Sequence, residues 1–338
     1  MVLLHSRRPR RGGEFIDDLF SEVSRRRDLT VFRRPVNRNT QTTYSRNVNG
    51  LLVVDKPEGL TSHDVVSRLR RALNESSIGH LGTLDPMATG VLPMLLGKYT
   101  RLAQFFGEMQ KAYSGIIRFG FSTDTYDAEG KPTSTAKSVN LSIEQIRHHA
   151  QTFHGEIDQT PPQFSAKKTA GKPAYKSARA GQVVELKPVR IRIERFEIRS
   201  FDVDLAEFFI AVSSGGYVRA VAHELGQSLG CGAHLAGLRR TEAGPFSLSD
   251  AVPLNEVERL CHDGDLGTCL RHPRELLPDL PAVTADELSA GRLRNGMAVN
   301  LPEFSNSPLV KIFYGQHDLI AIGKRIAGTL FQPKVVLG

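Results

Sequence analysis

The chain has 338 residues, enough for more than one domain, and 40% of them are hydrophobic, which suits a soluble globular protein. No apolar run approaches the roughly 18 residues of a membrane helix and no secretory leader pattern opens the chain, so we expect a cytoplasmic protein without a membrane segment. The net charge of +8 predicts a polyanionic partner, but residues 1–50 hold eleven arginines against five acidic residues, so the excess lies mostly in that tail.

Residues 1–49 form the first predicted segment, a basic and disordered arm. Four acidic residues in it (Glu14, Asp17, Asp18 and Glu22) argue against an organellar transit peptide. An RNA-contacting tail and an extension without function both fit its composition.

A buried strand is predicted over residues 50–57, followed by a helix that Thr61 or Ser62 can cap. The apolar face of that helix comes from four residues: Val65, Val66, Leu69 and Leu73.

The glycine- and proline-rich stretch 79–93 follows, and it is the most informative part of the sequence. It reads GHLGTLDPMATGVLP and contains one carboxylate, Asp85. Glycines permit backbone conformations that other residues avoid, and Pro86 disfavours helix at the residue before it. The stretch predicts a rigid loop that presents Asp85, either for chemistry or as a turn-forming Asp-Pro pair.

The remaining elements alternate irregularly, as in an α+β fold. We expect a strand over 91–96, a helix over 100–106, a strand from 111 through 119, and antiparallel strands over 189–201 and 208–213. A helix and connector cover 254–281. Short apolar runs at 309–314, 319–322 and 335–337 then predict a small β-rich module.

Cys231, Cys261 and Cys269 are odd in number and contain no CxxC pair, so neither a disulfide framework nor a zinc site is expected. His262 and His272 lie near two of them, but the spacing fits no common metal pattern. We therefore predict no metal.

The loop around Asp85 closely resembles the catalytic signature of the TruB-type pseudouridine synthases. Four further motifs of that family occur in the expected order, and they cover residues 55–62, 111–113 with 123–130, 159–168 with 174–179, and 215–219 with 229–234 and 238–240. Several motifs in order are far more specific than one short pattern. The resemblance spans about residues 50–247. The C-terminal part resembles, more weakly, the PUA-like domain found on many members.

The resemblance implies conversion of a uridine in RNA to pseudouridine. The base is detached from the sugar at N1 and rejoined through C5, so no atoms are gained or lost and no cofactor is implied. Asp85 is implied as the nucleophile, and Arg219 as the arginine that pairs with it and keeps it ionised. Tyr113 is implied to pack on the flipped base and to assist proton loss from C5.

Further residues are implied to contact the RNA. Tyr217 would form a second wall of the pocket, Leu238 an apolar contact, and His80 a contact where the base leaves the stack. Lysines are candidate phosphate contacts, each equally well read as a solvated surface residue: Lys56, Lys111, Lys167 and Lys168. Two positions depart from the family pattern, since Leu81 replaces a small residue and His223 an aspartate.

The implied protein is a stand-alone, bacterial-type synthase that modifies the T-loop uridine of tRNA conventionally numbered 55. We expect a monomer that binds the T-arm by shape and needs no obligatory protein partner. The implied organisation is an extension over 1–49, a catalytic domain over 50–250 with a mixed, mainly antiparallel sheet flanked by helices, a helical connector over 251–280, and a PUA-like RNA-binding domain over 281–338. Two alternatives stay open: the catalytic subunit of an RNA-guided pseudouridylation particle, and an RNA-binding or tRNA-folding chaperone with secondary catalysis.

Overall fold

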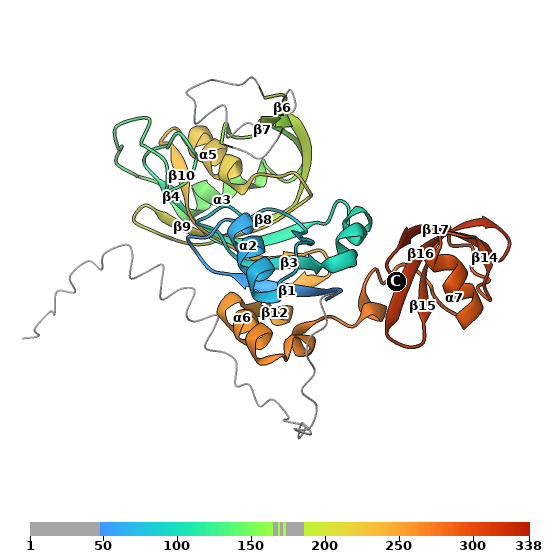
Figure 1. The fold of residues 1–338 in the computed structure, drawn as a ribbon. Coiled ribbons are helices and arrows are strands. Elements are labelled where there is room, and N and C mark those ends of the chain that lie inside the picture. Colours follow the sequence, from blue (N-terminus) through green and yellow to red (C-terminus); the bar gives the residue numbers. More distant parts are fainter. Residues whose placement is uncertain (1–47, 165–167, 170–171, 174–185) are drawn as a thin grey trace, which may run out of the picture. The chain divides into compact units, whose positions relative to one another are not determined.

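The computed structural model describes residues 48–164, 168–169, 172–173 and 186–338 (Figure 1). The arginine-rich arm up to residue 47, the motif residues 174–179 and the candidate phosphate contact Lys167 lie outside the described residues, as does the side chain of Lys168. No helix in the described ranges is long and apolar enough to span a membrane.

The larger of the two main sheets has ten strands and is mixed. Its main path runs β12-β1-β3-β10-β4-β9-β8-β5, while β2 pairs with β3 and β11 with β10. The pairs β1–β12 and β3–β10 are parallel and the other pairs of this sheet are antiparallel, so the predicted mixed, mainly antiparallel sheet is confirmed. The strands are β1 (Gly50–Lys56), β2 (Ile78–His80), β3 (Thr89–Leu96), β4 (Lys111–Phe119), β5 (Gly155–Gln159), β8 (Val189–Asp202), β9 (Leu205–Val212), β10 (Ala233–Ala243), β11 (Phe246–Ser247) and β12 (Ala251–Pro253).

Helices follow or flank these strands. They are α2 (Ser62–Leu73), α3 (Ile143–Gln151), α5 (Val218–Ser228) and α6 (Leu254–Asp263), with 3₁₀ helices η1 (Gly97–Phe105), η2 (Leu248–Asp250), η3 (Leu266–Cys269) and η4 (Pro273–Glu275). A short strand pair, β6 (Lys168–Thr169) with β7 (Lys172–Pro173), forms a separate two-stranded sheet.

Strand β1 is buried on both faces, which explains its nearly continuous apolar sequence. Leu52 and Val54 belong to the apolar cluster that contains the inward face of α2. Leu51 and Val53 point to the opposite face, where they belong to a second cluster. The loop and helix that follow β1 are therefore attached to a rigid strand.

Helix α2 begins where the sequence predicts. Thr61 is its N-cap: the Thr61 hydroxyl accepts a hydrogen bond from the Asp64 backbone N–H at 3.0 Å, and the Asp64 carboxylate accepts from the Thr61 N–H at 2.8 Å. This reciprocal capping box satisfies two N–H groups that the helix cannot pair internally. The expected helix over 100–106 is corrected to η1, a 3₁₀ helix that begins at Gly97 with a φ of 57° and has no side-chain cap.

A five-stranded sheet forms the C-terminal module, and it confirms the predicted β-rich module. Its order is β13-β15-β16-β17-β14, with helix α7 packed in the same apolar cluster. The elements are β13 (Ala282–Ala285), α7 (Glu287–Arg294), β14 (Val299–Asn300), β15 (Leu309–Tyr314), β16 (Asp318–Ala327) and β17 (Leu330–Val336). The sequence patterns of β13, α7 and β14 are too short to predict these three elements.

Candidate functional site

Asp85 lies in the loop between β2 and β3, as predicted. Glycines bound this loop, and Gly82 and Gly90 have φ values of 120° and 100°. A Cβ atom at Gly90 would lie 2.2 Å from the backbone oxygen of Arg240, so the register of β3 against β10 requires glycine there. The loop can thus return to the sheet within a few residues of Asp85.

Helix α2 and its N-terminal loop hold the Asp85 loop from one side. The Ser62 hydroxyl donates to the Leu84 carbonyl at 3.2 Å and accepts from the Leu84 N–H at 2.8 Å. The Gly59 N–H donates to the Pro86 carbonyl at 2.9 Å. The residues on both sides of Asp85 are therefore anchored.

Lys56 has a different environment from the one expected of a phosphate contact. Its ammonium group donates to the carbonyls of Pro57, Leu60 and Pro86 at 2.9, 2.6 and 3.2 Å, and the residue is 0% exposed. Burial lowers the pKa of this ammonium to about 8. The phosphate-contact prediction for Lys56 is therefore corrected, because RNA could reach the ammonium only by displacing the carbonyls that tie the Asp85 loop to residues 57–60.

Replacing Lys56 by methionine is expected to lower the free energy of unfolding by about 2 kcal/mol, because three carbonyls lose their donor while the removal of a buried charge offsets part of that loss. Urea unfolding followed by circular dichroism measures the change. Lys98→Met, at an exposed position, is the matched control and should change stability by less than about 0.5 kcal/mol. Equal free energies of unfolding for Lys56→Met and Lys98→Met would contradict the anchoring role of Lys56.

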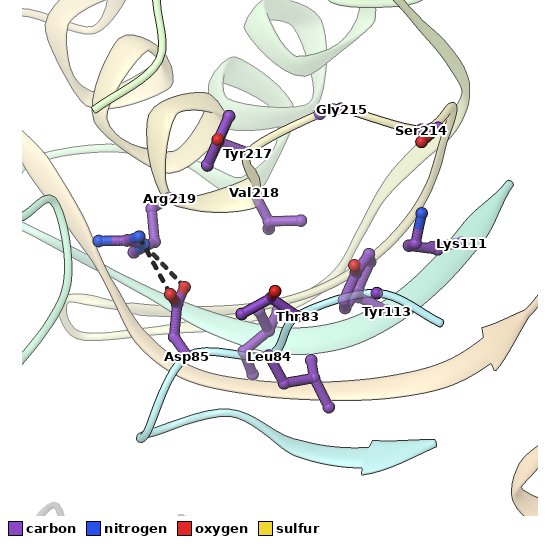
Figure 2. A pocket seen from close by; sticks show the side chains of 13 residues that line it. Thr83, Leu84, Asp85, Lys111, Tyr113, Ser214, Gly215, Tyr217, Val218 and Arg219 are labelled. Carbon is purple, nitrogen blue, oxygen red and sulfur yellow. Dashed lines mark hydrogen bonds and ion pairs between the residues drawn. The ribbon is translucent and has the colours of Figure 1, made fainter. Parts of the chain in front are cut away.

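Arg219 makes a two-point contact with Asp85 (Figure 2). It lies in the first turn of α5, two residues after the N-cap residue Tyr217. Its Nε lies 2.9 Å from Asp85 Oδ2, and its Nη2 donates to Asp85 Oδ1 at 3.1 Å. The Arg219 side chain is 6% exposed and that of Asp85 34% exposed. The two residues that the sequence paired across 134 positions thus meet in the structure.

A second carboxylate, that of Asp127, shares the same guanidinium. Arg219 Nη1 donates to Asp127 Oδ2 at 3.2 Å and to the Thr125 carbonyl at 3.1 Å, while Nη2 also reaches the Phe164 carbonyl at 3.1 Å. Asp127 is 2% exposed, and its Oδ1 accepts from the Thr125 hydroxyl at 2.5 Å. Asp127 and two backbone carbonyls therefore hold the Arg219 guanidinium in place, and its Nε and Nη2 atoms face Asp85.

Sequence reasoning assigned no role to Asp127, although its motif was recognised. The turn that places it depends on Tyr126, which has a φ of 65°, an uncommon conformation for a residue with a side chain. The signal that could have found it was an acidic residue inside a short Thr, Asp and Gly turn motif.

The Asp85 carboxyl group has a raised pKa. Burial is the main cause, the Arg219 guanidinium opposes it, and the Asp127 carboxylate adds to the rise. The expectation that Arg219 keeps Asp85 ionised therefore needs a refinement. Arg219 limits a shift that burial and the second carboxylate drive upward, so the reactivity of Asp85 depends on the balance between its two neighbours.

A cavity of about 270 Å³ opens over this ion pair. Its wall includes Asp85, Arg219, Tyr113, Tyr217 and Leu238, so five of the residues predicted for the site lie together. Burial raises the pKa of the Tyr113 phenol, and the Arg240 guanidinium opposes that rise. The volume is near the lower end of small-molecule sites, roughly 300–1,000 Å³, and the wall combines aromatic rings, an apolar side chain and one ion pair.

The other predicted positions lie outside the wall of this cavity, apart from Lys111, which lines it. His80 ends β2, and burial lowers its pKa, so its ring is neutral at pH 7. Leu81 is buried in the second apolar cluster. His223 stacks on Tyr126 with ring centroids 3.9 Å apart and planes 12° apart, next to the Asp127 turn.

Comparisons with known proteins show the family to which the chain belongs. Residues 70–218 match the family model described as TruB family pseudouridylate synthase (N terminal domain), and residues 219–277 match the tRNA pseudouridylate synthase B C-terminal domain. The chain is 43% identical over 293 residues to tRNA pseudouridine synthase B of Solibacter usitatus, covering 86% of this chain and 100% of that protein. It is 39% identical over 299 residues to the protein of the same name from Aquifex aeolicus, with the same two coverages.

Two solved structures illustrate the similarity in fold. A chain of a Cbf5-Nop10-Gar1 complex has a TM-score of 0.63 at 25% identity, covering 86% of this chain and 85% of that chain. A chain of an H/ACA RNP bound to a substrate RNA containing 2'-deoxyuridine has a TM-score of 0.62 at 24% identity with the same coverages, a likeness that concerns the fold alone.

Proposed function

The chain belongs to the TruB family of pseudouridylate synthases, and from that membership we propose that it isomerises the uridine at position 55 of the tRNA T-loop to pseudouridine, with Asp85 as the nucleophile. It is an isomerase whose curated relatives are named tRNA pseudouridine synthase B. The observation that carries the assignment of the site is the two-point contact between Asp85 and Arg219 at the wall of a cavity that also contains Tyr113, Tyr217 and Leu238.

The geometry suits an isomerisation that needs a covalent intermediate. The glycosidic bond to N1 breaks, the base turns, and C5 bonds to the same sugar carbon; C5 loses a proton and N1 takes one up, so the atoms balance. A carboxylate can bond to carbon and still leave again, which matches Asp85. Arg219 contacts both Asp85 oxygens and therefore orients the carboxylate as well as opposing its protonation.

Tyr113, Tyr217 and Leu238 supply the cavity wall against which a base turned out of its stack would pack. Unstacking a base costs a few kcal/mol, and stacking on aromatic rings returns about 1–3 kcal/mol per base. Tyr113 is buried and lines the same cavity as Asp85, so we assign it contact with the base and assistance with proton loss from C5.

The proposal includes a stand-alone protein that acts on the T-arm of tRNA in the cytoplasm and needs no obligatory protein partner. The division into a catalytic domain over 50–250, a connector over 251–280 and a PUA-like domain over 281–338 is part of it. The resemblance to a chain of a Cbf5-Nop10-Gar1 complex, at 25% identity, keeps the runner-up open, a guide-dependent subunit.

One assay tests the function and the runner-up together. Unmodified tRNA transcript is incubated with the full chain in the absence of guide RNA, and pseudouridine is mapped by carbodiimide treatment and primer extension. Modification at position 55 is expected. Modification that appears only with a guide RNA would favour the runner-up, and the absence of any modification would contradict the enzyme assignment.

Replacing Asp127 by asparagine is expected to move the acid limb of the pH–rate profile to lower pH. The Asp127 carboxylate raises the pKa of Asp85, so its removal lowers that pKa. Because the reaction needs ionised Asp85, the rate then persists to more acidic conditions. The plateau should fall by about 10- to 100-fold, since Arg219 loses a charged partner that positions it.

Single-turnover rates from pH 5 to pH 9 measure both effects for the parent and Asp127→Asn. An acid limb that moves to higher pH would contradict the assigned electrostatics. Asp124→Asn, an exposed carboxylate of the same motif, is the control and should leave the position of the acid limb unchanged.

A further inference from the structure

Arg240 is the largest side chain among the fully buried residues of the described chain, with 0% of its surface exposed. It lies in β10 between β3 and β4, opposite Gly90 on one side and Tyr113 on the other. Within residues 48–164 and 186–338, no carboxylate is placed at ion-pair distance from it, whereas its neighbour Arg239 pairs with Asp55 at 2.7 Å. A buried guanidinium without a carboxylate partner is costly, because its desolvation is not offset by an opposite charge.

Backbone carbonyls take the place of that partner. Arg240 Nε donates to the Val91 carbonyl at 2.7 Å, Nη2 to the Gly82 carbonyl at 3.1 Å, and Nη1 to the Thr83 carbonyl at 3.3 Å. Gly82 and Thr83 begin the Asp85 loop, and Val91 follows its end in β3. One planar side chain therefore joins the two ends of this loop.

The loop needs such a clamp because its ends are glycines. Gly82 and Gly90 both have positive φ values, and glycine has more alternative backbone conformations available than any other residue. Ser62 and Lys56 hold the middle of the loop from the side of α2. Without Arg240 the ends could shift relative to β10, and Asp85 would shift with them.

Arg240 also lies among the ionisable groups around the cavity. Its positive charge contributes to holding down the pKa values of Lys56, His80, Lys111 and Tyr113. These four residues come from three strands, β1, β2 and β4, and two of them, Lys111 and Tyr113, line the cavity. The distance of Arg240 from solvent keeps it from touching RNA directly.

We propose that Arg240 is a positioning residue for the isomerisation: by clamping both ends of the Asp85 loop, it fixes the Asp85 carboxylate against Arg219 and against the bound base. The inference rests on the proposed function. Arg240 does not contact the substrate in this role, so its replacement should lower the rate of the reaction without changing the affinity for tRNA. A displacement of about 1 Å in a reacting group can cost about 100-fold in rate.

The test compares Arg240→Lys and Arg240→Gln in the full chain. Lysine keeps the charge without the planar fork, and glutamine keeps a planar amide without the charge. We expect single-turnover rates of pseudouridine formation to fall by about 10-fold or more in Arg240→Lys and about 100-fold in Arg240→Gln. The Kd for tRNA should stay within about 2-fold, since a buried group makes no phosphate contact.

Arg239→Gln is the matched control, because it removes the adjacent arginine of the same strand and breaks the ion pair with Asp55. It should lower thermal stability while leaving the single-turnover rate within about 3-fold, which separates loss of stability from loss of positioning. Melting curves establish that each variant is folded at the assay temperature. If Arg240→Gln does not fold, Arg240→Lys carries the test alone.

The outcomes distinguish the inference from the function on which it rests. An unaltered chain that forms no pseudouridine would refute the proposed function. With an active parent, a folded Arg240→Lys that reacts at the parental rate would overturn the positioning role, as would a rate loss that saturating tRNA restores in full.

Discussion

Asp85→Asn is expected to abolish pseudouridine formation, with a fall in the single-turnover rate of at least about 10⁴-fold. The amide is nearly isosteric with the carboxylate, but it is neutral and is not a nucleophile towards carbon. It also presents an NH₂ group to one of the two Arg219 nitrogens that now contact carboxylate oxygens. The loss should therefore appear in the chemical step.

Binding of tRNA provides the internal control for this variant. The Asp85 side chain is 34% exposed at the cavity wall, and its replacement adds no bulk, so the Kd for tRNA should change by less than about 3-fold. Asp204→Asn removes a carboxylate that pairs with Arg118 away from the cavity and should retain the parental rate. Residual activity of Asp85→Asn within about 100-fold of the parent would exclude Asp85 as the nucleophile.

An unchanged affinity in an inactive Asp85→Asn also bears on the chaperone alternative. If that variant still promotes folding of tRNA, binding and chemistry are separable functions of one surface. If both are lost together, the Asp85 loop contributes to RNA binding as well as to chemistry. The measurement is refolding of a misfolded tRNA transcript, scored by aminoacylation, with each protein in turn.

The sequence predicted the parts of the site that depend on local chain chemistry. The helix cap, predicted at Thr61 or Ser62 and found at Thr61, depends on residues close in the chain, and the loop at Asp85 needs only its glycines and proline. The pairing of Asp85 with Arg219 came from the family resemblance, because nothing local connects two residues 134 positions apart. The structure supplies the physical link, a bidentate ion pair.

Other residues could not be placed from the sequence: Lys56, for which a phosphate contact was predicted, and the adjacent Arg239 and Arg240, for which no role was predicted. Lysines are mostly exposed, which favoured a surface role for Lys56, yet three carbonyls from separate points of the chain create a buried site for its ammonium. Arg239 and Arg240 are adjacent and identical in type, and only the register of β10 against β3 and β4 sends one to Asp55 and the other beneath the Asp85 loop. A register shift between Arg240 and Glu242 interrupts the regular alternation of side chains in β10, so the sequence alone does not predict which arginine faces which side.

Replacement of Arg219 is expected to have the second large effect, on activity and on stability together. Arg219→Met leaves Asp85 and Asp127 without the cation that they share, so the two carboxylates repel each other. Removing one partner of a buried ion pair costs about 3–5 kcal/mol of stability. The single-turnover rate at pH 7 should fall by at least about 10³-fold, because Asp85 loses both its orientation and the charge that opposes its protonation.

The stability and the activity of Arg219→Met should both depend on pH through the pKa of Asp85. The Arg219 guanidinium lowers the pKa of Asp85 against the effect of burial, so its removal raises that pKa further. A carboxyl group with a raised pKa in the folded state stabilises the protein at low pH, and that contribution is lost as the pH rises through the folded-state pKa. The stability penalty of Arg219→Met should therefore be smaller at pH 5 than at pH 8 in urea unfolding, while its acid limb of activity moves to higher pH.

Two further variants separate charge from geometry. Arg219→Lys keeps a cation but cannot contact both carboxylates with a planar fork, so it should fold and still lose about 100-fold in rate. Arg219→Met combined with Asp127→Asn removes the buried repulsion, and it should regain part of the stability lost in Arg219→Met without regaining the rate. Strictly additive stabilities in this double-mutant cycle would mean that the two residues do not interact, contrary to the 3.2 Å contact between them.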